Sequence, residues 1–476
     1  MATASKTASK TDRRWLSAAL AYLPKWLSFQ MERYRQTGCS LAIVQGSKVI
    51  ERLAFGVADL STGEALTTGH RFRIASHSKT FTATAVMLLR EQGKVGLDDS
   101  IGRYVTGLHK DLAKARVSEL LSHSAGVIRD GVDSGQFADR RPYLSRPELI
   151  EALSRKQPLL PGLQLKYSNH GYGLLGMMIE AITGQSYSGW ISKNVIGAAG
   201  LQETVCDWPF LPKSAAVARG HSAEFPFVQR LIVAGDNVCD AIAPAAGFVA
   251  TASDVARFFA QLAPDNKASV LSAASRREML QRRWRDNCNA QESHYGFGLM
   301  MNAPGPKEFW GHTGGFQGFV SRTAHFPSLD MTLSVLCNAQ DGMSYDWVDG
   351  IASILWAFRQ YGAPGKRHAD WDGRWWSMWG ATDLVAMGDA LRQVSPAMTR
   401  PFDDSNSELV LIGKDHGTIR RASAYNSPAQ DVRRVRDSKG KVIELWWGGG
   451  RLTSRQDMLA EVNTRYTKSK FVQYPQ

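Results

Sequence analysis

The sequence predicts an α+β fold, in which a mostly antiparallel sheet is flanked by helices and an all-helical region and is followed by a small antiparallel β-barrel. Apolar strand patterns occur at residues 38–57 and again at 319–338, and helical patterns fill the long span between them. A sheet that draws its strands from distant segments around a helical middle is typical of α+β proteins. Beyond residue 370, short apolar runs alternate with Gly, Asp and Asn turns, as in small barrels or sandwiches.

The elements of the main domain follow from their patterns in chain order. Residues 38–57, GCSLAIVQGSKVIERLAFGV, predict a hairpin of two strands joined by a Gln-Gly-Ser turn. Helical periodicity, in most cases ended near Gly or Pro, predicts the helices Thr80–Gln92, Pro147–Arg155, Gly173–Thr183, Ser188–Val195, Ser253–Leu262, Ser272–Gln281 and Trp347–Arg359. Strands return at Phe319–Phe326 and Met331–Asn338.

A change in composition at GAPGKRHAD, which is rich in Gly, Pro and charge, indicates an exposed linker. We therefore expect a polar tail and a first helix at 1–34, the main domain at 35–361, the linker at 362–369 and a β domain at 370–476. Within the β domain, runs such as Leu409–Ile412 and Val442–Trp447 predict strands. Its tryptophans are expected in the barrel core rather than in a ligand cage: Trp371, Trp375, Trp376, Trp379, Trp446 and Trp447.

The composition is that of an ordinary globular protein, since 43% of the 476 residues are hydrophobic and 21% are charged. The five cysteines are scattered and form no C-x-x-C pair, so we expect neither a disulfide framework nor a thiolate metal site. The net charge of +13 is spread along the chain, without a basic helix, an RNA-recognition signature or a zinc finger. This pattern argues against nucleic-acid binding.

No segment is apolar for long enough to cross a bilayer, which takes about 18–20 residues. The first residues are polar, and the LSAALAYLPKWL segment that follows is interrupted by Pro24 and Lys25, unlike the apolar core of a secretory signal. We therefore expect a cytoplasmic protein without a membrane partner. The oligomeric state stays open, a homo-oligomer included.

The first chemical motif is Ser76-His77-Ser78-Lys79, at the start of a helical pattern. Residues three apart share one face of a helix, so the Lys79 amine can reach the Ser76 hydroxyl. A serine hydroxyl is a weak nucleophile that needs an adjacent base, and a neutral lysine amine can serve as one. Ser78 is a competing nucleophile, but no lysine follows it at the same spacing.

Two further motifs follow the first along the chain. Tyr167-Ser168-Asn169 lies on a loop before a helix, where a tyrosine can move a proton to a leaving group and an asparagine amide can orient a substrate. His312-Thr313-Gly314-Gly315 leads into an apolar strand, and its glycines allow a ligand to approach the main chain closely. The Gly315 N–H could form an oxyanion hole together with that of Ser76.

The order S-x-x-K, then Y-x-N, then [K/H]-T-G resembles the active site of the serine penicillin-recognising enzymes. Over about residues 35–360 the chain is similar to the family of class C β-lactamases, D-alanyl-D-alanine carboxypeptidases, D-aminopeptidases and β-lactamase-like esterases. Supporting stretches are Leu120–Gly126 and Pro244–Thr251. The β domain more loosely resembles the lipocalin-like domain of some members.

The resemblance implies a role for each residue of the three motifs. Ser76 would be the acylated nucleophile, Lys79 its base and Tyr167 part of the proton relay, with His312 in support. Asn169, Thr313, Gly314 and Gly315 would bind the substrate and its oxyanion. The departure is His312, where the family more often carries lysine, a fixed cation for a substrate carboxylate.

The sequence therefore predicts a serine hydrolase that forms an acyl-enzyme with short peptides or amides, including ones that contain D-amino acids. A carboxylesterase or an acyl-transferring thioesterase is the alternative within the same fold. A penicillin-binding sensor or scaffold without turnover is the alternative from another class. No H-E-x-x-H pattern, paired histidine spacing, P-loop or dinucleotide fingerprint occurs, so we expect no metal and no cofactor.

Overall fold

The computed structural model describes residues 13–466 apart from 225–228, 289–290, 404–405 and 424–427. The polar tail expected at the start of the chain lies, up to residue 12, outside the described residues. The chain divides into two compact units, one of Gln36–Val348 and one of Met1–Arg35 together with Asp349–Gln476. The domain boundaries expected from the sequence stay predictions.

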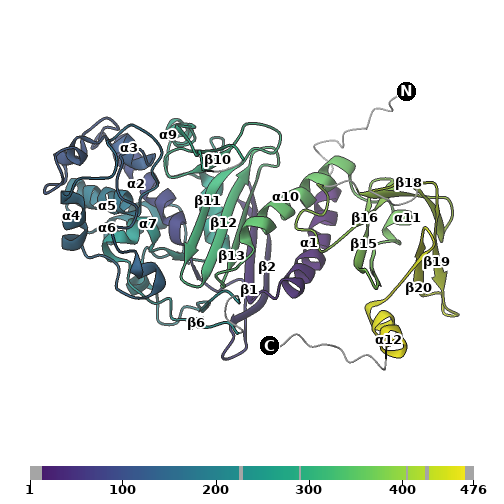
Figure 1. The fold of residues 1–476 in the computed structure, drawn as a ribbon. Coiled ribbons are helices and arrows are strands. Elements are labelled where there is room, and N and C mark those ends of the chain that lie inside the picture. Colours follow the sequence, from purple (N-terminus) through teal and green to yellow (C-terminus); the bar gives the residue numbers. More distant parts are fainter. Residues whose placement is uncertain (1–12, 225–228, 289–290, 404–405, 424–427, 467–476) are drawn as a thin grey trace. The chain divides into compact units, whose positions relative to one another are not determined.

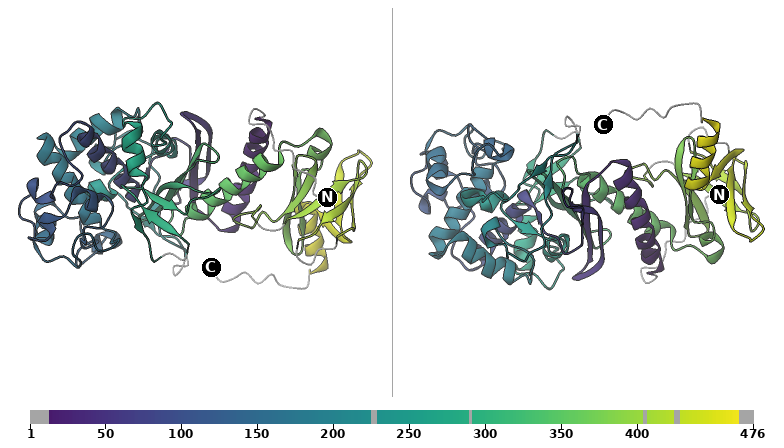
Figure 2. Two further views of the ribbon diagram at one scale, coloured as in Figure 1. Left: turned by 90° about the horizontal axis from the view of Figure 1, so that it is seen from above. Right: turned by 90° about the horizontal axis from the view of Figure 1, so that it is seen from below.

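The first unit is built on a nine-stranded antiparallel sheet, which confirms the predicted α+β class (Figures 1 and 2). Its central strands come from both ends of the unit, since Cys39 pairs with Cys337. In spatial order the strands are β3 (Glu64–Ala65), β2 (Lys48–Asp59), β1 (Gly38–Gln45), β13 (Met331–Cys337), β12 (Phe319–Phe326), β11 (Trp310–Phe316), β10 (Met300–Asn302), β9 (Ser293–Tyr295) and β8 (Trp284–Arg285).

Most helices between β3 and β8 gather on one side of this sheet in both figures. They are α2 (Ser78–Glu91), α3 (Val117–Leu121), α4 (Arg146–Ser154), α5 (Asn169–Thr183), α6 (Tyr187–Ile191), α7 (Ala243–Ala246), α8 (Ala252–Gln261) and α9 (Ala273–Met279). Short pairs of strands join β4 (Phe72–Arg73) to β7 (Val249–Ala250) and β5 (Gly220–His221) to β6 (Ile232–Val233). One continuous apolar core fills the space around them.

The predicted helices are present with shifted bounds, and two of the differences are informative. Helix α5 begins four residues early, because the Ser168 hydroxyl accepts a hydrogen bond from the Gly171 N–H at 2.9 Å and caps the first turn. The helix expected at 188–195 is instead the short α6 followed by a π-helical turn at Ser192–Gly197.

The second unit contains a closed antiparallel barrel of eight strands, as predicted. The strands are β14 (Gly373–Ser377), β15 (Gly380–Met387), β16 (Ala390–Val394), β17 (Ser407–Leu411), β18 (His416–Arg421), β19 (Asp431–Arg436), β20 (Val442–Trp447) and β21 (Gly450–Thr453). Trp371 and Trp447 lie in its apolar core. The expectation is wrong for Trp379, which is fully exposed because it stands in the turn between β14 and β15.

Helices accompany the barrel within this unit. They are α1 (Arg14–Arg33), α10 (Ser344–Tyr361), which begins at the end of the first unit, α11 (Lys366–Ala369) and α12 (Arg455–Arg465). Helix α1 packs on the barrel, where the Tyr22 hydroxyl donates to Asp383 at 3.0 Å and the Gln30 amide to the Pro396 carbonyl at 2.6 Å. Within the described residues, no helix is long and apolar enough to span a membrane.

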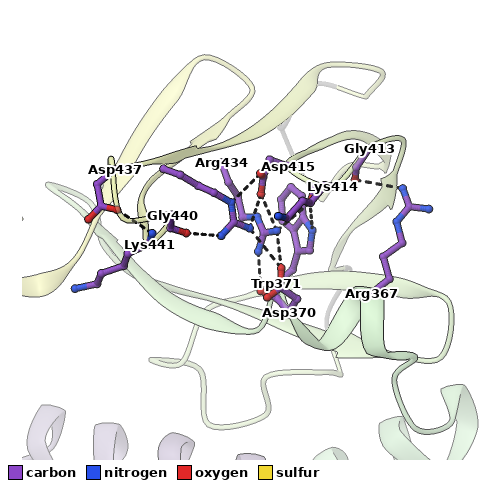
Figure 3. A network of polar contacts seen from close by, with 11 residues as sticks. Arg367, Asp370, Trp371, Gly413, Lys414, Asp415, Arg434, Asp437, Gly440 and Lys441 are labelled. Atoms are coloured by element: carbon purple, nitrogen blue, oxygen red, sulfur yellow. Dashed lines mark hydrogen bonds and ion pairs between the residues drawn. The ribbon is translucent and has the colours of Figure 1, made fainter.

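A buried arginine, Arg434, ties the segment before β14 to the turn between β17 and β18 (Figure 3). Its guanidinium stacks 4.1 Å from the centre of the Trp371 ring and donates to the carbonyls of Asp370 at 2.6 Å and Lys414 at 2.9 Å. It also forms an ion pair with Asp415 at 2.8 Å. The Trp371 indole donates to the same Lys414 carbonyl at 3.1 Å. One side chain therefore holds three segments together.

We expect Arg434→Met to destabilise the barrel by about 3 kcal/mol, because it removes the hydrogen bonds and ion pairs by which a buried guanidinium holds the other two segments. The matched control is Arg433→Met. Arg433 is exposed on the same strand, and its guanidinium lies over the Trp446 ring. Urea unfolding followed by tryptophan fluorescence measures both variants. Equal midpoints for the two would contradict this account of the Arg434 network.

Candidate active site

Ser76 lies in a short 3-10 turn (Ala75–His77) that leads directly into α2. The turn is strained, because Ala75 adopts a left-handed conformation at φ +47° that a residue with a Cβ seldom takes. Ser76 is half-buried, whereas His77 and Lys79 beside it are fully buried. The strained turn thus presents one hydroxyl at the surface of an otherwise closed region.

The Lys79 amine is held by three oxygen atoms. Its Nζ lies 3.0 Å from the Ser76 hydroxyl oxygen, 2.6 Å from Asn169 Oδ1 and 2.9 Å from the Ala245 carbonyl oxygen. Burial lowers the pKa of Lys79 well below that of an exposed lysine, although the nearby Asp130 carboxylate opposes this shift. The structure therefore favours the neutral amine.

A neutral amine has two hydrogens and one lone pair. The Asn169 and Ala245 oxygens accept only, so they take both hydrogens of the Lys79 amine. The lone pair is then left for the Ser76 hydroxyl. In this state the hydroxyl donates to the amine, which is the arrangement that lets a base remove the serine proton.

Tyr167 lies against the same pair of residues. Its hydroxyl is hydrogen-bonded to Ser76, and the Lys79 amine stands 4.7 Å from the centre of its ring. His123 stacks on Tyr167 with ring centres 4.1 Å apart, and its Nδ1 accepts the Ser168 N–H at 3.2 Å. Burial raises the pKa of Tyr167 above its ordinary value, so the phenol keeps its proton at neutral pH.

Asn169 has both ends of its side-chain amide engaged within the protein. Its oxygen accepts from Lys79, and its NH2 group donates to Asp130 Oδ1 at 2.6 Å. The other Asp130 oxygen pairs with Arg129 Nε at 3.0 Å. The structure thus shows Asn169 holding the lysine, and its predicted contact with the substrate stays a prediction.

Strand β11 brings the third motif to the serine. A Cβ on Gly314 would stand 2.3 Å from the Ile74 carbonyl oxygen, so only glycine lets the strand approach the turn that carries Ser76. Gly315 is exposed, with open space where a Cβ would be. The pairing of β10 with β11 stops at Gly311. Beyond Gly311, the edge of β11 is therefore unpaired on that side and open toward the turn that carries Ser76. Thr313 is half-buried on this edge.

His312 is buried and bonded to a residue that the sequence motifs did not include. Its Nε2 lies 2.9 Å from the Tyr295 hydroxyl, and its Nδ1 lies 3.0 Å from the Thr313 nitrogen. Burial lowers the pKa of His312 well below its usual value, so the ring is neutral at pH 7. Tyr295 packs against His123 at 4.6 Å between ring centres. Tyr295 lies in a Tyr-Gly-Phe-Gly run at 295–298, and this run is the sequence signal that could have pointed to it.

The neighbouring candidates are structural. The Ser78 hydroxyl donates to the Ala75 carbonyl at 2.5 Å and accepts from the Phe248 N–H at 3.1 Å, so it braces the turn. His77 bonds to Thr323 at 3.0 Å, and burial lowers its pKa to about 4. Within the described residues, no group of three or more histidine, cysteine or acidic side chains could hold a metal ion.

The structure thus brings all three sequence motifs to one place. The family profile described as β-lactamase matches residues 23–352, more than half of the chain. The chain belongs to the β-lactamase family. Among curated relatives, penicillin-binding protein 4* of Bacillus subtilis is 27% identical over 333 residues, which cover 66% of this β-lactamase-family chain and 71% of the relative.

Solved structures share the fold of this family member at lower identity. The octameric penicillin-binding protein homologue from Pyrococcus abyssi covers 91% of the chain and 100% of that protein, with a TM-score of 0.62 and 20% identity. The D-amino acid amidase from Ochrobactrum anthropi SV3 covers 71% of the chain and 98% of that protein, with a TM-score of 0.60 and 23% identity. The family match places the chain among hydrolases of the β-lactamase fold, and these neighbours share that fold.

Proposed function

We propose that the protein is a serine hydrolase that forms an acyl-enzyme with short peptides or amides, including ones that contain D-amino acids. The observation that carries the proposal is the buried Lys79 amine, whose nitrogen lies within hydrogen-bond distance of Ser76 Oγ, Asn169 Oδ1 and the Ala245 carbonyl oxygen, so that a neutral amine would keep its lone pair for the serine. A structural lysine has no need of this arrangement, because burying an amine without a counter-ion is costly.

Acylation follows from this geometry. Lys79 takes the Ser76 proton while the serine oxygen bonds to the substrate carbonyl carbon. The negative charge that develops on the carbonyl oxygen would be met by the N–H groups of Ser76 and Gly315, which flank the open edge of β11. The amine or alcohol then leaves with a proton from the Tyr167 hydroxyl, and Lys79 returns the proton to Tyr167. Water releases the acyl group by the reverse steps.

The neutral His312 supports amides over substrates that need a cation at position 312. His312 cannot replace the fixed cation of a lysine, because burial keeps its ring uncharged. The Tyr295 hydroxyl fixes the orientation of the ring beside the motif. The likeness to a D-amino acid amidase, although it shows only the fold, supports the same substrate class. Esters react by the same route, and are the second substrate class to be tested.

A matched substrate screen tests the proposal. p-Nitroanilides and p-nitrophenyl esters of L- and D-amino acids report amide and ester cleavage for both chiralities, and Ser76→Ala protein supplies the background rate. We expect turnover of anilides by the wild type, with D-substrates among those cleaved. Cleavage of esters alone would favour the carboxylesterase alternative. Covalent labelling without turnover of any substrate would favour a sensor.

A further inference from the structure

The candidate site has a charged arginine at its edge that the three motifs do not use. Arg129 lies over the Tyr167 ring, with its Cζ 5.6 Å from the ring centre. Its side chain is 67% exposed, whereas that of Asp130 beside it is 11% exposed. The Arg129 carbonyl accepts the N–H groups of Asn169 at 3.0 Å and His170 at 3.3 Å, so the backbone of this residue is fixed at the start of α5.

A continuous chain of polar contacts ties Arg129 to the nucleophile. The Ser76 oxygen contacts the Lys79 amine, which contacts Asn169; the Asn169 amide donates to Asp130, and Asp130 pairs with Arg129 Nε. The guanidinium is therefore held by its Nε at the rim of the site. Such a held side chain loses little freedom when it binds a ligand.

The outer half of the guanidinium is unused. In the part of the chain that the structure describes, Arg129 Nη1 and Nη2 donate no hydrogen bond, and the contact with Asp130 is made at Nε. These two nitrogens form the planar fork that matches the two oxygens of a carboxylate. The fork lies beside the Tyr167 phenol, which would protonate the leaving group. An anion bound by the fork would therefore be part of the leaving group.

We propose that Arg129 binds a carboxylate on the leaving group, and so selects substrates that end in a free carboxylate on that side. The inference rests on the proposed function and names a substrate feature that His312 does not recognise. The Asp130 carboxylate contacts Arg129 at Nε and accepts from the Asn169 amide, so the outer nitrogens of the guanidinium stay open to a second carboxylate. Arg129 thus supplies from the loop between α3 and α4 the cation that position 312 lacks.

The test compares two esters that differ only in charge: 3-carboxyphenyl phenylacetate and 3-carbamoylphenyl phenylacetate. For the wild type we expect the larger kcat/KM with the carboxylate. Arg129→Met should lower the carboxylate-to-amide ratio of kcat/KM by about 10-fold or more, the usual size of a charge-assisted hydrogen bond. Arg129→Lys should retain part of the preference. The control is Arg140→Met, an exposed arginine of the same loop, which should leave the ratio unchanged.

A binding measurement separates this inference from the proposed function. In a Ser76→Ala background, the Kd values of the two esters are compared with and without Arg129→Met. A preference for the carboxylate that disappears with Arg129 supports the inference even when the wild type turns over neither ester. Equal ratios in Arg129→Met and wild-type protein, or an equal loss with both esters, would overturn it and leave Arg129 as a support for Tyr167.

Discussion

Replacing Ser76 by Ala should abolish covalent labelling and turnover together. The Ser76 hydroxyl oxygen lies 3.0 Å from the Lys79 amine, which is the base proposed to activate it. Loss of a serine nucleophile costs on the order of 10³-fold or more in rate. Intact-mass analysis after reaction with a fluorophosphonate measures labelling, and a p-nitrophenyl ester measures turnover.

Ser78→Ala is the matched control, because Ser78 is the competing serine in the same motif. Its hydroxyl braces the turn rather than facing solvent, so we expect labelling to persist with a stability loss of about 1 kcal/mol. A labelled Ser76→Ala protein would show that the nucleophile had been misassigned. Labelling that is lost in Ser78→Ala alone would point to the other serine.

Lys79→Met should lower kcat/KM by about 10²- to 10⁴-fold, the usual contribution of a general base. Methionine fills similar space without an amine, so Ser76 keeps its position and loses its proton acceptor. The control is Lys94→Met, because Lys94 is exposed just beyond the end of α2 and should not affect the rate. A Lys79→Met enzyme within threefold of the wild type would exclude the amine as the base.

The pKa of Lys79 also predicts the pH dependence of the rate and of stability. Only the neutral amine accepts a proton, so wild-type kcat/KM should fall as the pH drops through the lowered pKa of Lys79. In the unfolded chain Lys79 has the higher pKa of an ordinary lysine and is protonated below that pH. The folded state disfavours the protonated amine, so below that pH the shift lowers the free energy of unfolding. Lys79→Met should therefore unfold at an equal or higher urea concentration at pH 7, despite its lost activity.

Much of the fold could be predicted because its signals are local. Strand Phe319–Phe326 has the predicted bounds, and the hairpin at 38–57 and the barrel strand at 442–447 lie where alternating apolar residues placed them. The S-x-x-K spacing predicted that the lysine reaches the serine, since residues three apart face one way on a helix. Strands β8 to β10 were missed, because two or three residues are too few to show a period.

The rest of the site depends on contacts between distant segments. Tyr295 meets His312 only because β9 lies two strands away from β11 in the sheet. Asp130 meets Asn169 through the return of a loop across 39 residues, which no spacing rule encodes. The sequence also could not predict that both ends of the Asn169 amide are hydrogen-bonded within the protein. A sequence pattern gives residue types but not which hydrogen bonds are already satisfied.

The packing of α1 with a barrel formed at the other end of the chain has a consequence for synthesis. On the buried face of α1, Trp26 lies against Gly350 of α10 and donates to the Met398 carbonyl. These segments are made roughly 300 residues later, on the order of tens of seconds at ordinary rates of translation. Until then these contacts cannot form. The growing polypeptide therefore carries an apolar helix ahead of the segments that will cover it, and its yield in cells depends on keeping that helix from other nascent chains.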